Sequence, residues 1–148
     1  MLLREHLTET FLVMNGDVLS DLDFAAFEAF HRQKGGLATV ATARRQVVID
    51  FGVIHTDPDA RIVNFLEKPR YHHFVSMGIY LFEPDILKYV PGDGQPFGFD
   101  NLMHVLTQNH AGVFAYHHEG DWLDIGRLED YEKAVEEFSA RWERYLTS

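Results

Sequence analysis

Apolar residues gather in short runs separated by turn residues, a pattern typical of strands that alternate with helices. The first run, Phe11–Met14, stops at Asn15-Gly16-Asp17 and predicts a buried strand that ends in a turn. The next segment predicts a helix that follows Asp21 and ends near Lys34, because three Phe recur at helical spacing ahead of Gly35-Gly36. The chain therefore opens with a strand, a loop and a helix.

The same alternation continues to the end of the chain. Residues 57–60, Asp-Pro-Asp-Ala, form a turn signal that joins two of the predicted strands into a hairpin, and Pro84 suits the first turn of a short helix. The last predicted helix carries an apolar stripe, which we expect to pack on the sheet. The further strands are predicted at Leu37–Ala43, Phe51–His55, Arg61–Leu66, His73–Phe82 and Gly112–His117, and the further helices at Asp100–Asn109 and Leu128–Tyr145.

This order of elements predicts an α/β fold with a mixed, mostly parallel sheet flanked by helices. The uniformly apolar strand Phe11–Met14 is typical of a central position in such a sheet. If it is central, the chain lacks strands on one side of it. We therefore expect residues 1–148 to form a single partial domain.

Charge and composition narrow the range of partners. The 13 basic and 23 acidic residues give a net charge of −10, which disfavours nucleic acid and anionic membranes. The absence of Cys excludes disulfides, thiolate metal sites and a Cys nucleophile. Apolar runs are too short to span a bilayer, and charged residues near Met1 stand where a signal peptide needs apolar ones, so we expect a cytoplasmic protein.

Two carboxylates are candidates for chemistry. Asp17 lies on a turn after a buried strand, where open α/β sheets bind their ligands, and Asp124 lies between apolar residues. A half-buried carboxylate must be paired, cap a helix or bind a metal, and Mg²⁺ takes such oxygen ligands. Ordinary turn chemistry at Asn15-Gly16-Asp17 and a cap on the helix near Leu128 remain open alternatives.

Two strand segments also stand out. Glu67-Lys68-Pro69 ends a strand with adjacent opposite charges, which fits either a solvated edge or a binding site. Gly78 lies inside the strand segment Ser76–Tyr80, where it weakens pairing unless something approaches the backbone closely. A bound sugar ring and a β-bulge would each provide such a reason.

Taken in order, these segments resemble the sugar-phosphate nucleotidyltransferases, a family that includes mannose-1-phosphate guanylyltransferases and glucose-1-phosphate thymidylyltransferases. The resemblance covers nearly the whole chain and implies part of a GT-A-like nucleotide-diphospho-sugar transferase fold. The matching segments are Phe11–Asp17, Phe51–Ile54, Phe65–Pro69, Ser76–Tyr80, Trp122–Gly126 and Asp130-Tyr131.

The resemblance also implies a reaction and its site residues. A sugar 1-phosphate attacks the α-phosphorus of a nucleoside triphosphate, pyrophosphate leaves, and a nucleotide sugar forms, which requires charge neutralisation and positioning. Asp17 and Asp124 would bind the catalytic Mg²⁺, and Lys68 would meet the phosphate of the sugar. The residues expected against the sugar, with Ser at a position where the family usually has Asn, are Gly52, Glu67, Ser76 and Gly78.

One family motif does not occur in the sequence. The family begins with a strand and a loop that reads G-G-x-G-T-R-L, and Gly35-Gly36 does not replace it because a strand follows directly. Such loops present backbone N–H groups to phosphates. We therefore expect the isolated chain to be inactive, and we expect its exposed sheet edge to pair with a second copy or with a complementing chain.

Two other functions remain open. Asp21-Leu22-Asp23 matches the Asp-x-Asp pattern of glycosyltransferases, although acidic residues at a helix start also serve as caps. A non-catalytic sugar-phosphate-binding or regulatory subunit would fit the missing loop but would not need Asp17 and Asp124. The pairs His72-His73 and His117-His118 predict no shared metal ion, because neighbouring strand residues face opposite ways.

Overall fold

The computed structural model describes residues 4–92, 95–126, 128, 130–132 and 134–136. The chain divides into two compact units, one of residues 1–43 and 76–148 and the other of residues 44–75. Two long strands, β3 (Ala38–Val48) and β6 (Arg70–Phe82), contribute residues to both units.

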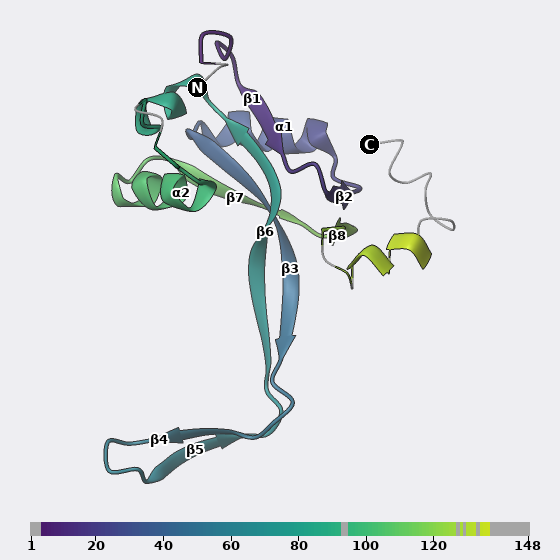
Figure 1. The fold of residues 1–148 in the computed structure, drawn as a ribbon, viewed down its shortest axis with the longest axis vertical. Coiled ribbons are helices and arrows are strands. Elements are labelled where there is room, and N and C mark those ends of the chain that lie inside the picture. The colour runs from purple at the N-terminus through teal and green to yellow at the C-terminus, as the bar shows by residue number, and fades with distance from the viewer. Residues whose placement is uncertain (1–3, 93–94, 127, 129, 133, 137–148) are drawn as a thin grey trace. The chain divides into compact units, whose positions relative to one another are not determined.

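The first unit is built on a four-stranded sheet with the order β1-β6-β3-β7 (Figure 1). Its outer strands are β1 (Phe11–Met14) and β7 (Val113–His118). β1 pairs antiparallel with β6, and β3 pairs parallel with β7. The predicted mixed sheet is confirmed. Among the described strands, β3 and β7 form the parallel pair, whereas β6 runs in the opposite direction to its neighbour β1.

Helices cover both faces of this sheet. The helix α1 (Phe24–Lys34) begins after Asp23, whose Oδ1 accepts a 2.9 Å hydrogen bond from the amide of Ala26, and ends at Gly35 with φ of 61°. On the other face lie the short 3₁₀ helix η1 (Pro84–Tyr89) and the helix α2 (Phe99–Gln108). The predicted helices are thereby confirmed at these three places.

The side chains of β6 point alternately to the two faces of the sheet, so they belong to two separate layers of the core. Met77, Ile79 and Leu81 pack in a cluster with Phe27 of α1, whereas Tyr80 packs with residues of η1 and α2. All five of these side chains are buried. Successive side chains of a strand point to opposite faces, so one strand supplies both layers.

A second pairing in this unit was not predicted from the sequence. The three-residue strands β2 (Val18–Ser20) and β8 (Trp122–Asp124) form an antiparallel ribbon. Segments this short show no readable hydrophobic period. The ribbon joins the stretch that follows β1 to the stretch that precedes the last helix.

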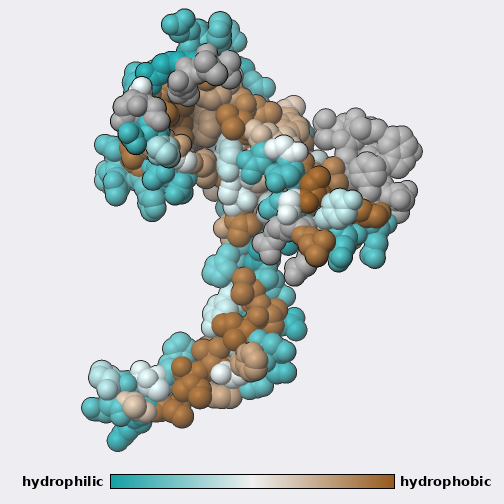
Figure 2. Space-filling model, viewed as in Figure 1, coloured by the Kyte–Doolittle hydropathy of each residue, from teal (hydrophilic) through white to brown (hydrophobic). Residues whose placement is uncertain are grey.

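The second unit contains the predicted hairpin, formed by β4 (Val53–Thr56) and β5 (Ile62–Leu66). Its turn is held by Asp57, whose Oδ1 accepts hydrogen bonds from the amides of Asp59 at 3.0 Å and Arg61 at 2.9 Å. Figure 2 shows apolar surface along this unit. Its large apolar residues with at least half of their surface exposed are Val47, Phe51, Ile54, Ile62, Val63, Phe65 and Phe74.

The predicted strands 37–43 and 73–82 are longer in the structure, because β3 extends to Val48 and β6 starts at Arg70. Of the predicted helix Leu128–Tyr145, Leu128, 130–132 and 134–136 are helical, and the remaining positions lie outside the described residues. No helix in the described ranges is long and apolar enough to cross a membrane.

Candidate functional site

Asp17 lies on a turn that is fixed at both ends. At its start, the amide of Asn15 donates a 2.9 Å hydrogen bond to the carbonyl of Gly78 in β6. At its end, the carbonyl of Asp17 accepts a 2.9 Å hydrogen bond from the amide of Ile125, next to the β2–β8 ribbon. The carboxylate thus lies just beyond the carboxyl end of β1, as the sequence predicts.

Asp124 is the last residue of β8 and pairs with Val18. Its Oδ1 accepts a 3.2 Å hydrogen bond from the amide of Gly126, and its amide donates a 3.4 Å hydrogen bond to Oδ2 of Asp130. The hydrogen bond from the amide of Gly126 to the side chain of Asp124 therefore closes a tight turn ahead of the helix at Leu128.

The two carboxylates converge on Gly126. A Cβ atom built on this glycine would lie 2.6 Å from Oδ2 of Asp17 and 3.2 Å from Oδ1 of Asp124. Since both oxygens are close to one point, they are also close to each other. Only a residue without a side chain leaves room between them, and two neighbouring negative charges favour a cation that they share.

The donor set suits a small, hard cation. Mg²⁺ is commonly bound by one or two carboxylates while water and substrate phosphates complete its octahedron. Within the described residues, no group of three or more His, Asp and Glu side chains could hold a metal. Asp17 and Asp124 are thus compatible with a site that the substrate completes, rather than with an all-protein cage.

Gly78 and Ser76 lie at the same end of β1. Gly78 has φ of 76°, and a Cβ on it would lie 2.7 Å from Nδ2 of Asn15. The close approach of Asn15 is therefore a sufficient reason for glycine here. Ser76 donates a 3.0 Å hydrogen bond to the hydroxyl of Tyr80 and accepts a 3.2 Å hydrogen bond from the amide of Gly78, so its hydroxyl has partners within the strand.

The other predicted sugar-site residues lie together in the second unit. A Cβ on Gly52 would lie 2.6 Å from Cζ of Phe65 and 3.4 Å from Oε2 of Glu67. Nζ of Lys68 lies 3.3 Å from Oδ1 of Asp50, and these side chains are 57% and 80% exposed. Such an exposed ion pair is weak, so the ammonium group can exchange this partner for a phosphate.

The predicted site residues therefore form two groups. Asp17 and Asp124 belong to the first unit, together with Ser76 and Gly78. The group in the second unit consists of Gly52, Glu67 and Lys68.

The two carboxylates of Asp21-Leu22-Asp23 serve different local structures. Oδ1 of Asp21 accepts hydrogen bonds from Nε2 of His118 at 2.9 Å and from the amide of Asp121 at 2.7 Å. Asp23 caps α1. Nδ1 of the neighbouring His117 lies 2.9 Å from Oγ1 of Thr42. These contacts do not favour a shared cation of the glycosyltransferase type.

Asn15 and Asp130 were missed as site residues by sequence reasoning. Asp130 is only 7% exposed and contacts the amide of Asp124, and Asn15 packs against Gly78. The apolar stripe predicted for this helix did not point to Asp130. Its described members Leu128, Tyr131 and Val135 are 72%, 53% and 56% exposed, so the expectation that the stripe packs on the sheet is wrong for them. Asn15 is hidden in the sequence because Asn-Gly is also ordinary turn chemistry.

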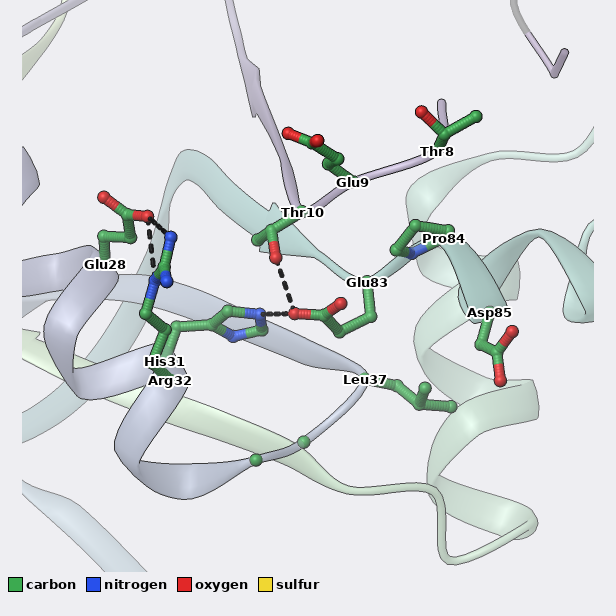
Figure 3. A pocket seen from close by; sticks show the side chains of 12 residues that line it. Thr8, Glu9, Thr10, Glu28, His31, Arg32, Leu37, Glu83, Pro84 and Asp85 are labelled. Atoms are coloured by element: carbon green, nitrogen blue, oxygen red, sulfur yellow. Dashed lines mark hydrogen bonds and ion pairs between the residues drawn. The ribbon is translucent and has the colours of Figure 1, made fainter. Parts of the chain in front are cut away.

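A polar cavity of about 1020 Å³ lies at the opposite end of β1 from Asp17. Figure 3 shows Glu83 there between two partners, with its Oε1 2.7 Å from Oγ1 of Thr10 and 3.0 Å from Nε2 of His31. None of the predicted site residues lines this cavity. The contacts among its polar side chains indicate a structural role.

Fold and site together define an α/β protein with a carboxylate pair beyond the end of a sheet strand. Residues 1–141 match the family model described as nucleotidyl transferase, and the chain belongs to that family. It is 35% identical over 134 residues to a UTP–glucose-1-phosphate uridylyltransferase of Synechocystis sp., covering 86% of this chain and 34% of that protein. It is 32% identical to a mannose-1-phosphate guanylyltransferase catalytic subunit beta of Drosophila pseudoobscura pseudoobscura, covering 83% and 33%.

Solved structures show the same fold. HddC from Yersinia pseudotuberculosis superposes with a TM-score of 0.64 at 24% identity, covering 93% of this chain and 59% of that chain. The chain spans about a third of the length of the curated relatives it matches. The predicted family is therefore confirmed, for a chain much shorter than these relatives.

Proposed function

We propose that this chain supplies the metal-binding and sugar-phosphate-binding portion of a sugar-phosphate nucleotidyltransferase with a GT-A-like fold. The whole enzyme would transfer a nucleotidyl group from a nucleoside triphosphate to a sugar 1-phosphate and release pyrophosphate. The observation that carries the proposal is the convergence of Asp17 and Asp124 on Gly126. The names of the relatives, which join a nucleotide to glucose 1-phosphate or mannose 1-phosphate, support the reaction class.

In this proposal, Asp17 and Asp124 hold Mg²⁺. The bound ion would neutralise charge on the reacting phosphates and orient them. The pairing of Val18 with Asp124 and the bond from the amide of Ile125 to the carbonyl of Asp17 fix the two carboxylates before a substrate arrives. Such preorganisation lowers the cost of assembling the reacting groups.

The second unit would recognise the sugar phosphate. Lys68 would exchange its exposed partner Asp50 for the phosphate, and the carboxylate of Glu67 would accept hydrogen bonds from sugar hydroxyls. Gly52 would contact the sugar through its backbone groups, because the ring of Phe65 fills the space where a Cβ atom would lie. In the first unit, Gly78 and Ser76 would offer backbone groups to the substrate, since the hydroxyl of Ser76 is engaged by Tyr80.

We also propose that a second polypeptide, either a complementing chain or a second copy, covers the edge of the sheet. Support comes from β1, an outer strand of the described sheet, where Leu12, Val13 and Met14 are 47%, 40% and 41% exposed. Unpaired strand edges with apolar side chains bind other strands. A cytoplasmic location belongs to the same proposal, because the nucleoside triphosphates that it needs as substrates are kept there.

The test is pyrophosphate release with Mg²⁺ over a panel of nucleoside triphosphates and sugar 1-phosphates. The chain is assayed alone and with a segment that carries the family's Gly-rich loop, added separately or fused ahead of Met1. Turnover is expected only when that segment is present, and Asp17→Asn or Asp124→Asn should lower it about 100-fold or more. Asp23→Asn is the matched control, because it removes a nearby charge but preserves the cap of α1.

Turnover that survives both Asp17→Asn and Asp124→Asn would contradict the metal pair. Complete inactivity with the added segment, accompanied by binding of sugar 1-phosphate, would favour the non-catalytic subunit. Turnover by the chain alone would show that the Gly-rich loop is dispensable.

A further inference from the structure

We propose that Asp21 and His118 are positioning residues that set the register of β2 against β8 and thereby bring Asp124 to Asp17. This inference rests on the proposed metal site. It assigns a role to a second carboxylate of the same region, one that does not touch the metal.

The β2–β8 ribbon is too short to hold its register through the backbone alone. Its pairs are Val18↔Asp124, Leu19↔Leu123 and Ser20↔Trp122. A two-stranded ribbon is marginally stable in water even when its strands are longer. Contacts outside the three pairs must therefore contribute to its geometry.

The end of the ribbon that lies away from Asp17 has several such contacts. Asp21 directly follows β2, and its Oδ1 accepts a 2.7 Å hydrogen bond from the amide of Asp121, which directly precedes β8. The amide of Asp21 donates a 3.3 Å hydrogen bond to the carbonyl of Asp121, which also accepts a 3.1 Å bond from Oγ of Ser20. These bonds hold Asp121, which directly precedes β8, against Ser20 and Asp21 at the end of β2.

His118 connects this end to the large sheet. It is the last residue of β7, and its Nε2 lies 2.9 Å from Oδ1 of Asp21. Because an ionised carboxylate only accepts hydrogen bonds, Nε2 is the donor. The two side chains are only 10% and 23% exposed, so water competes weakly for this bond. The ribbon is therefore tied to β7 as well as paired within itself.

The loop between β7 and β8 leaves little room for a different arrangement. A Cβ on Gly120 would lie 2.6 Å from Cε1 and 2.7 Å from Nε2 of His118 and would also collide with Asp21. A side chain at this position would therefore separate the two residues. Only glycine allows the loop to close over them.

Register decides whether the two carboxylates meet. A slip of one residue between β2 and β8 turns every side chain of the moved strand to the opposite face. Asp124 would then no longer face Gly126 together with Asp17. The contact between Asp21 and Asp121 lies at the far end of the ribbon, because Asp21 is four residues after Asp17 and Asp121 is three residues before Asp124. It therefore opposes such a slip directly.

The test is Mn²⁺ binding by the full chain, followed as paramagnetic broadening of the amide NMR signals of Ile125 and Gly126. Asp21→Ala removes the acceptor and should weaken Mn²⁺ binding about 10-fold, as loss of a supporting contact at a metal site does. Asp21→Asn retains an acceptor oxygen and should restore most of the affinity. Asp23→Asn, which removes one charge two residues away, should leave the affinity unchanged.

His118→Phe is the second variant, which removes the donor but keeps a planar ring, and it should also weaken binding. It decides the outcome if Asp21→Ala fails to fold, as judged from the amide signals of β1 and β6. Wild-type affinity in a folded Asp21→Ala or His118→Phe variant would overturn the positioning role. An absence of broadening at Gly126 in the wild type would instead overturn the metal site itself, and this inference with it.

Discussion

At the scale of single residues, glycines occur where other side chains approach the backbone closely. Gly126 leaves the space between Asp17 and Asp124, and Gly78 accommodates both a left-handed backbone and the side chain of Asn15. From the sequence, either a bound sugar ring or a β-bulge would explain a glycine at position 78. The contact with Asn15 explains this glycine without a ligand.

Gly78→Ala should therefore destabilise the fold. Alanine at φ of 76° is strained, and its Cβ would lie 2.7 Å from Nδ2 and 2.9 Å from Cγ of Asn15. We expect the free energy of unfolding to fall by about 1–3 kcal/mol, measured by urea denaturation. Gly92→Ala is the control, since a Cβ there meets nothing within 4 Å, and it should leave stability unchanged. Equal stability of both variants would contradict the strain assigned to Gly78.

At the scale of elements, the longer segments could be predicted from the sequence and the shortest could not. The strand Phe11–Met14, the hairpin with its turn at 57–60 and the helix that ends at Gly35 follow from periodicity and turn chemistry. β2 and β8 were missed because three residues carry no period and their pairing joins segments about 100 residues apart. Their register, which brings Asp17 and Asp124 together, is a long-range property that only the fold reveals.

The candidate site was predictable to a similar degree. The position of Asp17 after the strand Phe11–Met14 follows from local patterns, although this strand is an exposed outer strand rather than the buried one predicted. The metal-binding role of both Asp17 and Asp124 came from the resemblance to the family. Sequence spacing alone left open whether Asp124 caps the helix near Leu128. In the structure, the side chain of Asp124 accepts a hydrogen bond from the amide of Gly126, in the turn ahead of that helix. Asp21 was read as a helix-start residue, although Asp23 is the cap and Asp21 contacts His118.

The β4–β5 hairpin should be sensitive to the space beside Gly52. A Cβ at this position would lie 2.6 Å and 2.7 Å from ring atoms of Phe65, so Gly52→Ala must displace that ring. We expect faster amide hydrogen exchange at Ile54, which pairs with Phe65. The double variant Gly52→Ala/Phe65→Ala removes the collision and should restore part of the protection. Slow exchange in Gly52→Ala alone would contradict this packing.

At the scale of the whole molecule, exposed apolar surface and net charge have opposite effects on the association of chains. The chain carries a net charge of −10, which opposes association, while outer strand β1 and the hairpin unit expose apolar side chains. The proposed second polypeptide would cover such a surface. The curated relatives that this chain matches are about three times as long as this chain.

Self-association through β1 predicts a clear mutational response. Val13→Lys places a charge on the exposed strand, which blocks edge pairing, and should lower the association constant at least about 10-fold in sedimentation equilibrium. Gln108→Lys adds the same charge on the exposed surface of α2 and should have a much smaller effect. A wild-type chain that stays monomeric would leave the complementing chain as the partner, and equal effects of both variants would exclude β1 as the interface.

In the proposed function, this chain binds a sugar 1-phosphate together with a divalent cation. The most direct measurement is a titration of the ¹⁵N-labelled chain with Mg²⁺ and glucose 1-phosphate or mannose 1-phosphate, followed by amide chemical shifts. We expect saturable shifts at Gly52, Lys68 and Gly126, and we expect the Gly126 response to be lost in Asp17→Asn and Asp124→Asn. No response, or the same response to glucose with inorganic phosphate, would contradict the proposed function.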